Sequence, residues 1–283
     1  MLNSIKRIVE FYVYSNSHIA LSAGIYVLGA SYLGHMSSMG ILDLPILVAI
    51  STYIVYNTHR LVGSFKLSEL TGPNRILFVK KYWLVLGFIF VGLAVLSIDL
   101  LTFIPYSLWY IIIPCTILTL LYLLPVLPGR RRLRDLPLIK ILIIAIVWAG
   151  VFLLPLIADN YEYAPIILTT VFIEKIFFFF MITIPFDYRD KAIDDDQGTP
   201  TLATSLSTVS LKRLITAAFI VVVVAVLVLY DYQLYNMTVC SALLATYILS
   251  LILSIYGIND RSELYYLGVL DGMILLNGAA YLF

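Results

Sequence analysis

The chain has 283 residues, of which 61% are apolar and only 12% are charged, with a mean hydropathy of +0.99. This composition excludes an ordinary soluble domain, and the near-zero net charge of +1 excludes a basic nucleic-acid-binding protein. Two isolated cysteines and three scattered histidines argue against a disulfide scaffold or a zinc site. We therefore predict an integral, multi-pass membrane protein.

The apolar residues gather into nine stretches that are each close to the length of a membrane crossing, which takes about 20 residues of helix. They lie at 18–36, 42–62, 82–98, 105–124, 138–157, 164–186, 213–230, 238–257 and 264–283. Continuous runs of this length favour helices over barrel strands. We expect one all-α domain, a bundle of nine transmembrane helices over residues 1–283. The helical spacing of apolar residues within 1–17 predicts an interfacial amphipathic helix, with a frayed terminus as the alternative.

Lysine and arginine are distributed unevenly among the loops. The loops 37–41, 99–104, 158–163 and 231–237 contain neither residue, whereas the alternate loops and the amino-terminal segment carry nearly all of them. Because basic residues accumulate on the cytoplasmic side, we predict a cytoplasmic amino terminus and an exterior carboxyl terminus.

The most polar segment, 185–202, follows the sixth apolar stretch. Asp187, Asp190 and Asp194 are spaced i, i+3, i+7, which places them on one stripe of a helix. Pro185 either kinks the sixth helix or begins a new one. Three carboxylates on one stripe repel one another, and their hard oxygen atoms suit Mg²⁺ together with substrate phosphates. The alternative is a solvated acidic face, although surface charge next to the hydrocarbon boundary is costly.

The segment from Asp187 to Asp194, followed by Gly198 and Thr201-Leu202, resembles the second aspartate-rich motif of the UbiA superfamily of intramembrane prenyltransferases. Residues 121–125, the arginine cluster after them and residues 136–148 are similar to the segment entering that family's fifth helix. The resemblance implies a nine-helix fold with its motifs facing the cytoplasm. It also implies a Mg²⁺ cofactor and a prenyl diphosphate partner.

The family's first motif contains three aspartates, and here only its asparagine is matched, by Asn57; the aspartate positions fall on Thr58, Leu61 and Phe65. Arg60 lies one turn from Asn57 and offers a planar guanidinium suited to phosphate oxygens, although it could equally be a snorkelling boundary arginine. Lys140, just inside the fifth stretch, could reach a terminal phosphate or serve as a topological anchor. For His59 a packed polar role is favoured.

The predicted site therefore consists of two groups of residues. They are the catalytic and metal-binding Asp187, Asp190 and Asp194, and the substrate-binding Asn57, Arg60 and Lys140.

The predicted function is transfer of a prenyl group from an isoprenyl diphosphate to a small aromatic or lipid-like acceptor, within membrane lipid and without nucleic acid. The same ionisation could end in cyclisation, as in a terpene cyclase. The missing first motif also fits a non-catalytic isoprenoid-binding relative. Glu174, Lys175 and Asp271 lie within apolar stretches, where charges are costly; they favour either buried ion pairs or a transporter.

Overall fold

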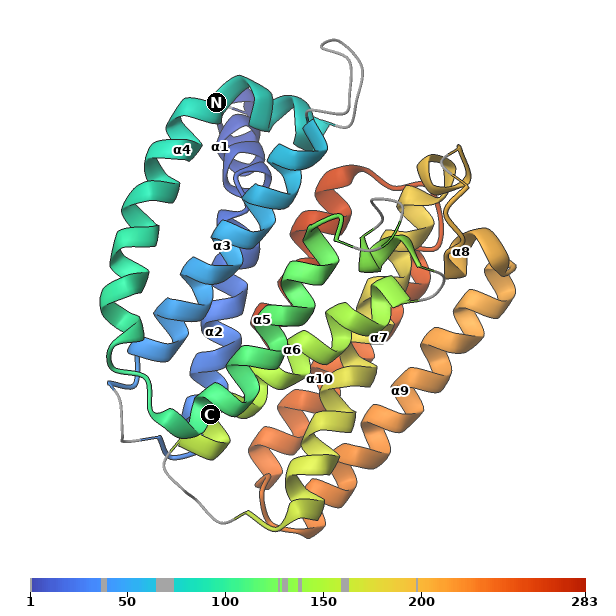
Figure 1. Cartoon of the computed structure of the whole chain (residues 1–283). Coiled ribbons are helices and arrows are strands. Elements are labelled where there is room, and N and C mark those ends of the chain that lie inside the picture. Colours follow the sequence, from blue (N-terminus) through green and yellow to red (C-terminus); the bar gives the residue numbers. More distant parts are fainter. Residues whose placement is uncertain are drawn as a thin grey trace.

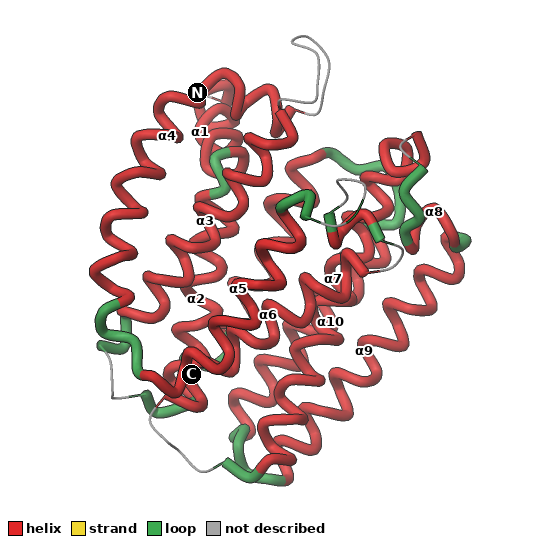
Figure 2. The backbone as a smooth tube through the Cα atoms, in the orientation of Figure 1, coloured by secondary structure: helices red, strands yellow, loops and turns green. Residues whose placement is uncertain are grey.

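The computed structural model describes residues 2–36, 40–64, 74–126, 128, 132–136, 139–158, 163–196 and 198–283. In these residues the chain forms helices and no strands, as Figure 2 shows. The long helices run side by side, with α4 at one edge of the bundle and α9 at the other (Figure 1). The predicted all-α membrane bundle is confirmed at the level of the fold.

Eleven α-helices lie in the described part of the chain. They are α1 (Leu2–Tyr14), α2 (Ser17–Leu33), α3 (Asp43–Ser64), α4 (Asn74–Leu101), α5 (Trp109–Leu123), α6 (Ile139–Ala158), α7 (Pro165–Asp196), α8 (Leu202–Ser205), α9 (Thr208–Asp231), α10 (Met237–Tyr256) and α11 (Asp271–Ala279). Two 3₁₀ turns precede α5 and α6, η1 (Tyr106–Leu108) and η2 (Leu133–Asp135), and a π-helical segment, η3 (Tyr265–Leu270), leads into α11.

Helices lie in all nine predicted spans. Among the described helices, six are long and apolar enough to cross a membrane: α4, η1 with α5, α6, α7, α9 and α10. The total of nine crossings therefore stays a prediction. Helix α4 begins at Asn74, before the predicted third span, and is kinked at Tyr82, the residue at which that span was predicted to begin.

The predicted amino-terminal helix is present as α1. Its Ile5 and Ile8 are exposed, whereas Val13 and Tyr14 near its end are buried against Leu267 of η3. The last turns of α1 therefore pack on the bundle, and its position at the membrane interface stays a prediction.

The acidic stripe extends the sixth span without interruption. Helix α7 runs from Pro165 to Asp196 and contains Pro185 in its interior. Proline removes one backbone hydrogen bond, yet the helix continues, so the alternative in which a new helix begins at Pro185 is wrong. The three aspartates are consequently held in register with the membrane-embedded part of α7.

Close backbone contact joins the first and last predicted spans. A Cβ atom added to Gly29 of α2 would lie 2.1 Å from the carbonyl oxygen of Gly278 in α11, so only glycine allows this approach. The two ends of the chain lie at opposite ends of the bundle, with the amino terminus at the end that also carries α8 (Figure 1).

Candidate functional site

The carboxylates of the acidic stripe differ in their surroundings. Asp187 and Asp194 are buried, with 2% and 8% of their surface exposed, and Asp190 lies between them in sequence. All three occupy the last three turns of α7, as the i, i+3, i+7 spacing predicts. Buried carboxylates need a compensating charge, and the structure supplies it from helices distant in sequence.

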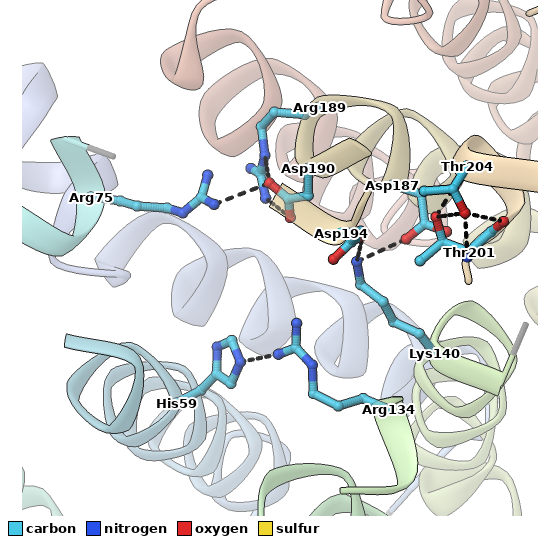
Figure 3. Close-up of polar contacts among 10 residues, drawn as sticks. All are labelled: His59, Arg75, Arg134, Lys140, Asp187, Arg189, Asp190, Asp194, Thr201 and Thr204. Carbon is cyan, nitrogen blue, oxygen red and sulfur yellow. Dashed lines mark hydrogen bonds and ion pairs between the residues drawn. The ribbon is translucent and has the colours of Figure 1, made fainter. Parts of the chain in front are cut away.

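Lys140, from the first turn of α6, is the cation between the first and third aspartates (Figure 3). Its Nζ atom lies 2.9 Å from Oδ1 of Asp187 and 3.6 Å from Oδ2 of Asp194. Lys140 itself is only 8% exposed. The two carboxylates therefore converge on one point, which an ammonium group occupies.

Asp190 is held by two arginines instead. Nε and Nη2 of Arg189 donate to its two carboxylate oxygens at 2.8 and 2.9 Å, and Nη2 of Arg75 donates at 3.1 Å (Figure 3). Arg75, at the start of α4, also donates through Nη1 to Glu263 at 2.9 Å. This ion network links α4, α7 and the segment before η3. Three charge-assisted hydrogen bonds thus already occupy the oxygens of Asp190. Its metal-binding role stays a prediction.

One guanidinium nitrogen of Arg189, Nη1, takes no part in this network. Nη1 is buried and donates no hydrogen bond to any residue that the structure describes. The guanidinium carbon lies 5.1 Å from the ring centre of Phe186 and 5.5 Å from that of Tyr266, which fixes its plane. A buried donor of this kind is unfavourable unless a ligand or an ordered water accepts its hydrogen bond.

Gly198 and Thr201, which carry part of the family resemblance, shape the chain after the acidic stripe. Gly198 has a φ of 63°, in the left-handed region that glycine adopts at little cost. Thr201 is the N-cap of α8: its Oγ1 accepts from the amide of Thr204 at 3.3 Å, and Oγ1 of Thr204 accepts from the amide of Thr201 at 2.8 Å. This capping box holds the chain in a tight return beside Lys140 (Figure 3).

The structure places Asn57 and Arg60 beside the turn between α1 and α2. Nδ2 of Asn57 donates to the carbonyl oxygen of Ser15 at 3.1 Å, and its Oδ1 accepts from Asn16 at 3.0 Å. Nη1 of Arg60 donates to the carbonyl oxygen of Tyr14 at 2.6 Å. Both side chains thus bind the end of α1, and their contact with a substrate stays a prediction.

His59 lies across the same end of the bundle from Lys140 (Figure 3). It contacts Nη1 of Arg134 through Nε2, so that nitrogen accepts and the ring proton sits on Nδ1. The Arg134 guanidinium also lies 5.2 Å from the ring centre of Tyr122. The pair connects η2 with α3 and α5, which agrees with a packed polar role for His59.

The charges predicted inside the sixth span form a separate buried network. Nζ of Lys175 lies 2.8 Å from Glu174 and donates to the hydroxyl of Tyr281 at 2.5 Å, and Tyr235 donates to Glu174 at 2.7 Å. Tyr247 also contacts Glu174. Both charged side chains are fully buried, so these partners satisfy them within the bundle.

Asp187 and Asp194 together fit one divalent cation. Mg²⁺ commonly takes one or two carboxylates and completes its shell with water and phosphate oxygens. The described residues contain no group of three or more His, Cys, Asp or Glu side chains that could hold a metal ion. Two carboxylates are fewer ligands than Mg²⁺ takes, so phosphate oxygens and water would have to complete its shell. The metal-binding role of Asp187 and Asp194 stays a prediction.

Comparison with solved structures shows the fold. A UbiA homologue from Archaeoglobus fulgidus superposes with a TM-score of 0.62 at 13% identity, covering 96% of this chain and 98% of that one. The same homologue bound to GPP and Mg²⁺ gives 0.61 at 13% identity, covering 96% and 99%. A digeranylgeranylglyceryl phosphate synthase gives 0.60 at 14% identity, covering 97% and 96%. The chain has the UbiA-superfamily fold. No family model and no curated protein matches the sequence.

Two residues of this UbiA-fold site were not singled out from the sequence. Arg75 is one of the basic residues of the alternate loops and Glu263 belongs to no motif, yet both join the Asp190 network. Arg189 lies within the acidic motif, and the spacing of the motif indicates no role for it. A basic residue at the start of a membrane helix is ordinary, so nothing in the local pattern distinguishes Arg75 from an anchor.

Proposed function

We propose that this protein transfers a prenyl group from an isoprenyl diphosphate to a small aromatic or lipid-like acceptor. The observation that carries the proposal is the buried charge cluster at the end of α7, where Asp187 and Asp194 converge on Lys140. Further support comes from the fold, because a UbiA homologue from Archaeoglobus fulgidus with the same fold has been solved with GPP and Mg²⁺ and with DMAPP and Mg²⁺.

Lys140 and Arg189 are the groups assigned to the diphosphate. The Lys140 ammonium can turn from the aspartates towards a phosphate oxygen, and the free Nη1 of Arg189 can donate to another. Asp190 keeps the Arg189 guanidinium in place. Stabilising negative charge on the leaving diphosphate lowers the barrier for breaking the carbon–oxygen bond.

Asp187 and Asp194 would hold Mg²⁺, which when bound supplies further positive charge against the leaving diphosphate. The bond electrons leave with the diphosphate, the acceptor attacks the allylic carbon, and the acceptor then loses a proton. Water must be kept from the same carbon.

Aromatic side chains provide that exclusion deeper in the bundle. Trp148 stacks on Phe179 with ring centres 5.0 Å apart, and Tyr26 lies against both. Trp148 is eight residues beyond Lys140 on α6, and Phe179 is eight residues before Asp187 on α7. At 1.5 Å per residue, both lie about 12 Å from the charge cluster. Their π faces favour a nearby allylic cation.

The test is turnover by the purified full chain with prenyl diphosphates of several lengths, with and without Mg²⁺, in the presence of aromatic and lipid-like acceptors. We expect Mg²⁺-dependent diphosphate release and a product with the mass of a prenylated acceptor. Asp194→Asn should lower the rate about 10²- to 10³-fold, whereas Asp196→Asn, an exposed carboxylate on the same helix, should not.

Two outcomes would overturn the proposal. Acceptor-independent formation of a cyclic hydrocarbon would indicate a terpene cyclase. Binding of prenyl diphosphates without consumption of any would indicate a non-catalytic relative.

A further inference from the structure

Lys140 occupies the point where a divalent ion would sit. Its Nζ atom lies within 4 Å of one oxygen of Asp187 and one oxygen of Asp194, at 2.9 and 3.6 Å. These are the two carboxylates whose oxygens remain outside the arginine network. An ammonium ion and a metal ion cannot share that point, because both would be held by the same two carboxylates and would repel each other.

The contact is one of charge without directed hydrogen bonds. Lys140 Nζ, Asp187 Oδ1 and Asp194 Oδ2 are buried, and none of these atoms forms a hydrogen bond with a described residue. Asp190 shows the opposite arrangement, with three hydrogen bonds from two guanidinium groups. The Asp190 network is therefore a fixed part of the site, whereas the cation between Asp187 and Asp194 is held in a way that allows exchange.

We propose that Lys140 is a built-in counter-ion that keeps the metal position filled in the ligand-free protein and yields it only when a diphosphate draws the ammonium group away. This inference rests on the proposed function, because a diphosphate is the anion that moves Lys140. Metal and diphosphate then bind with positive coupling, each raising the affinity of the other by the same factor. The lysine thereby sets the order of binding, with the diphosphate before the metal.

A flexible lysine side chain suits this exchange. Its ammonium group ends a four-carbon stem whose rotations can carry the charge from the aspartates to a phosphate oxygen on the same side of α6. The positive charge inside the site is thereby preserved before and after the metal enters. The buried aspartates are never left without a counter-charge, which a low-dielectric site requires.

The experiment measures Mn²⁺ affinity directly, by electron paramagnetic resonance of the free ion, for the full chain in detergent without any diphosphate. Lys140→Met keeps the length of the stem and removes the charge, so we expect it to bind Mn²⁺ at least about tenfold more tightly than wild type, within the roughly 5- to 150-fold range of couplings between sites. Lys140→Arg keeps a cation and should bind as weakly as wild type. Lys212→Met, which removes a charge from the start of α9, is the matched control and should also match wild type.

Equal Mn²⁺ affinity of wild type and Lys140→Met would overturn the inference, whatever the turnover assay shows. If Lys140→Met folds only when Mn²⁺ is present, the metal has replaced the missing ammonium and the inference is supported. If Lys140→Met folds neither with nor without Mn²⁺, the Mn²⁺ affinity of the wild-type protein tests the inference. Tight Mn²⁺ binding by ligand-free wild type contradicts the inference, and binding that strengthens at least tenfold with a saturating prenyl diphosphate supports it.

The outcome is separable from the proposed function. If Lys140→Met binds Mn²⁺ more tightly but the wild-type protein transfers no prenyl group, the counter-ion inference is supported and the proposed function is contradicted. If the wild-type protein turns over prenyl diphosphates but Lys140→Met has an unchanged Mn²⁺ affinity, the proposed function is supported and the counter-ion inference is contradicted.

Discussion

Arg189 binds the carboxylate of Asp190, its neighbour in the chain, through two parallel hydrogen bonds of 2.8 and 2.9 Å. Adjacent residues of a helix point about 100° apart, so this contact requires the long arginine side chain to fold back along α7. Its consequence is a guanidinium group fixed at the end of the bundle with Nη1 still available.

Replacement of Arg189 by lysine tests the use of that nitrogen. Arg189→Lys keeps the positive charge but loses the fork, and a hydrogen bond to a charged group contributes about 1.5–3 kcal/mol. We expect the affinity for a prenyl diphosphate to fall about tenfold to a hundredfold, measured by titration calorimetry in micelles. The control is Arg213→Lys, an exposed arginine of α9, which should leave the affinity unchanged. Equal affinities of Arg189→Lys and wild type would show that Nη1 does not contact the diphosphate.

The ion pair inside the sixth span predicts a strong effect on stability. Lys175→Met leaves the Glu174 carboxylate fully buried without its cation, and breaking a buried pair in this way costs about 3–5 kcal/mol. The double variant Glu174→Gln/Lys175→Met removes both charges and should lose less. Unfolding in mixed micelles measures both free energies. A double variant less stable than Lys175→Met would contradict a network whose main function is mutual neutralisation.

Much of the bundle could be predicted from the sequence, because long apolar stretches and a 100° stripe of aspartates are local patterns. The partners of those aspartates were not predictable in the same way. The hydrogen bond from Arg75 to Asp190 joins residues 115 positions apart, and no spacing rule indicates which loop cation reaches which carboxylate. Arg60 shows a related limit: its side chain binds the carbonyl of Tyr14, and only the three-dimensional path of the α1–α2 turn brings that carbonyl close.

The contact between Gly29 and Gly278 predicts a steric penalty. In Gly29→Ala the new Cβ atom would lie 2.1 Å from a carbonyl oxygen, so α2 and α11 must separate. We expect a loss of at least about 1–3 kcal/mol of unfolding free energy, typical of an overpacked contact. Gly87→Ala is the control, since a Cβ atom there has no described neighbour within 4 Å and alanine favours helix. Equal stabilities of the two variants would show that the helices can separate at no cost.

Reporter fusions test the predicted orientation. A fusion at Gly198, beside the acidic stripe, should read cytoplasmic, and a fusion after Phe283 should read exterior, because the loops that lack lysine and arginine are expected outside. The two positions act as internal controls for each other. An exterior reading at Gly198 would place the proposed diphosphate site on the side opposite to the one expected.

The turn between α1 and α2 connects the amino-terminal helix to α3. Asn16 adopts a left-handed conformation with a φ of 64°, which asparagine tolerates, and its amide pairs with Asn57. Together with the Tyr14 carbonyl that accepts from Arg60, this turn gives buried polar groups of α3 their partners. A truncated protein beginning after Asn16 would leave the side chains of Asn57 and Arg60 without these partners, which is unfavourable for buried polar groups. The end of the amino-terminal helix is thus joined to the bundle by buried polar contacts as well as by apolar packing.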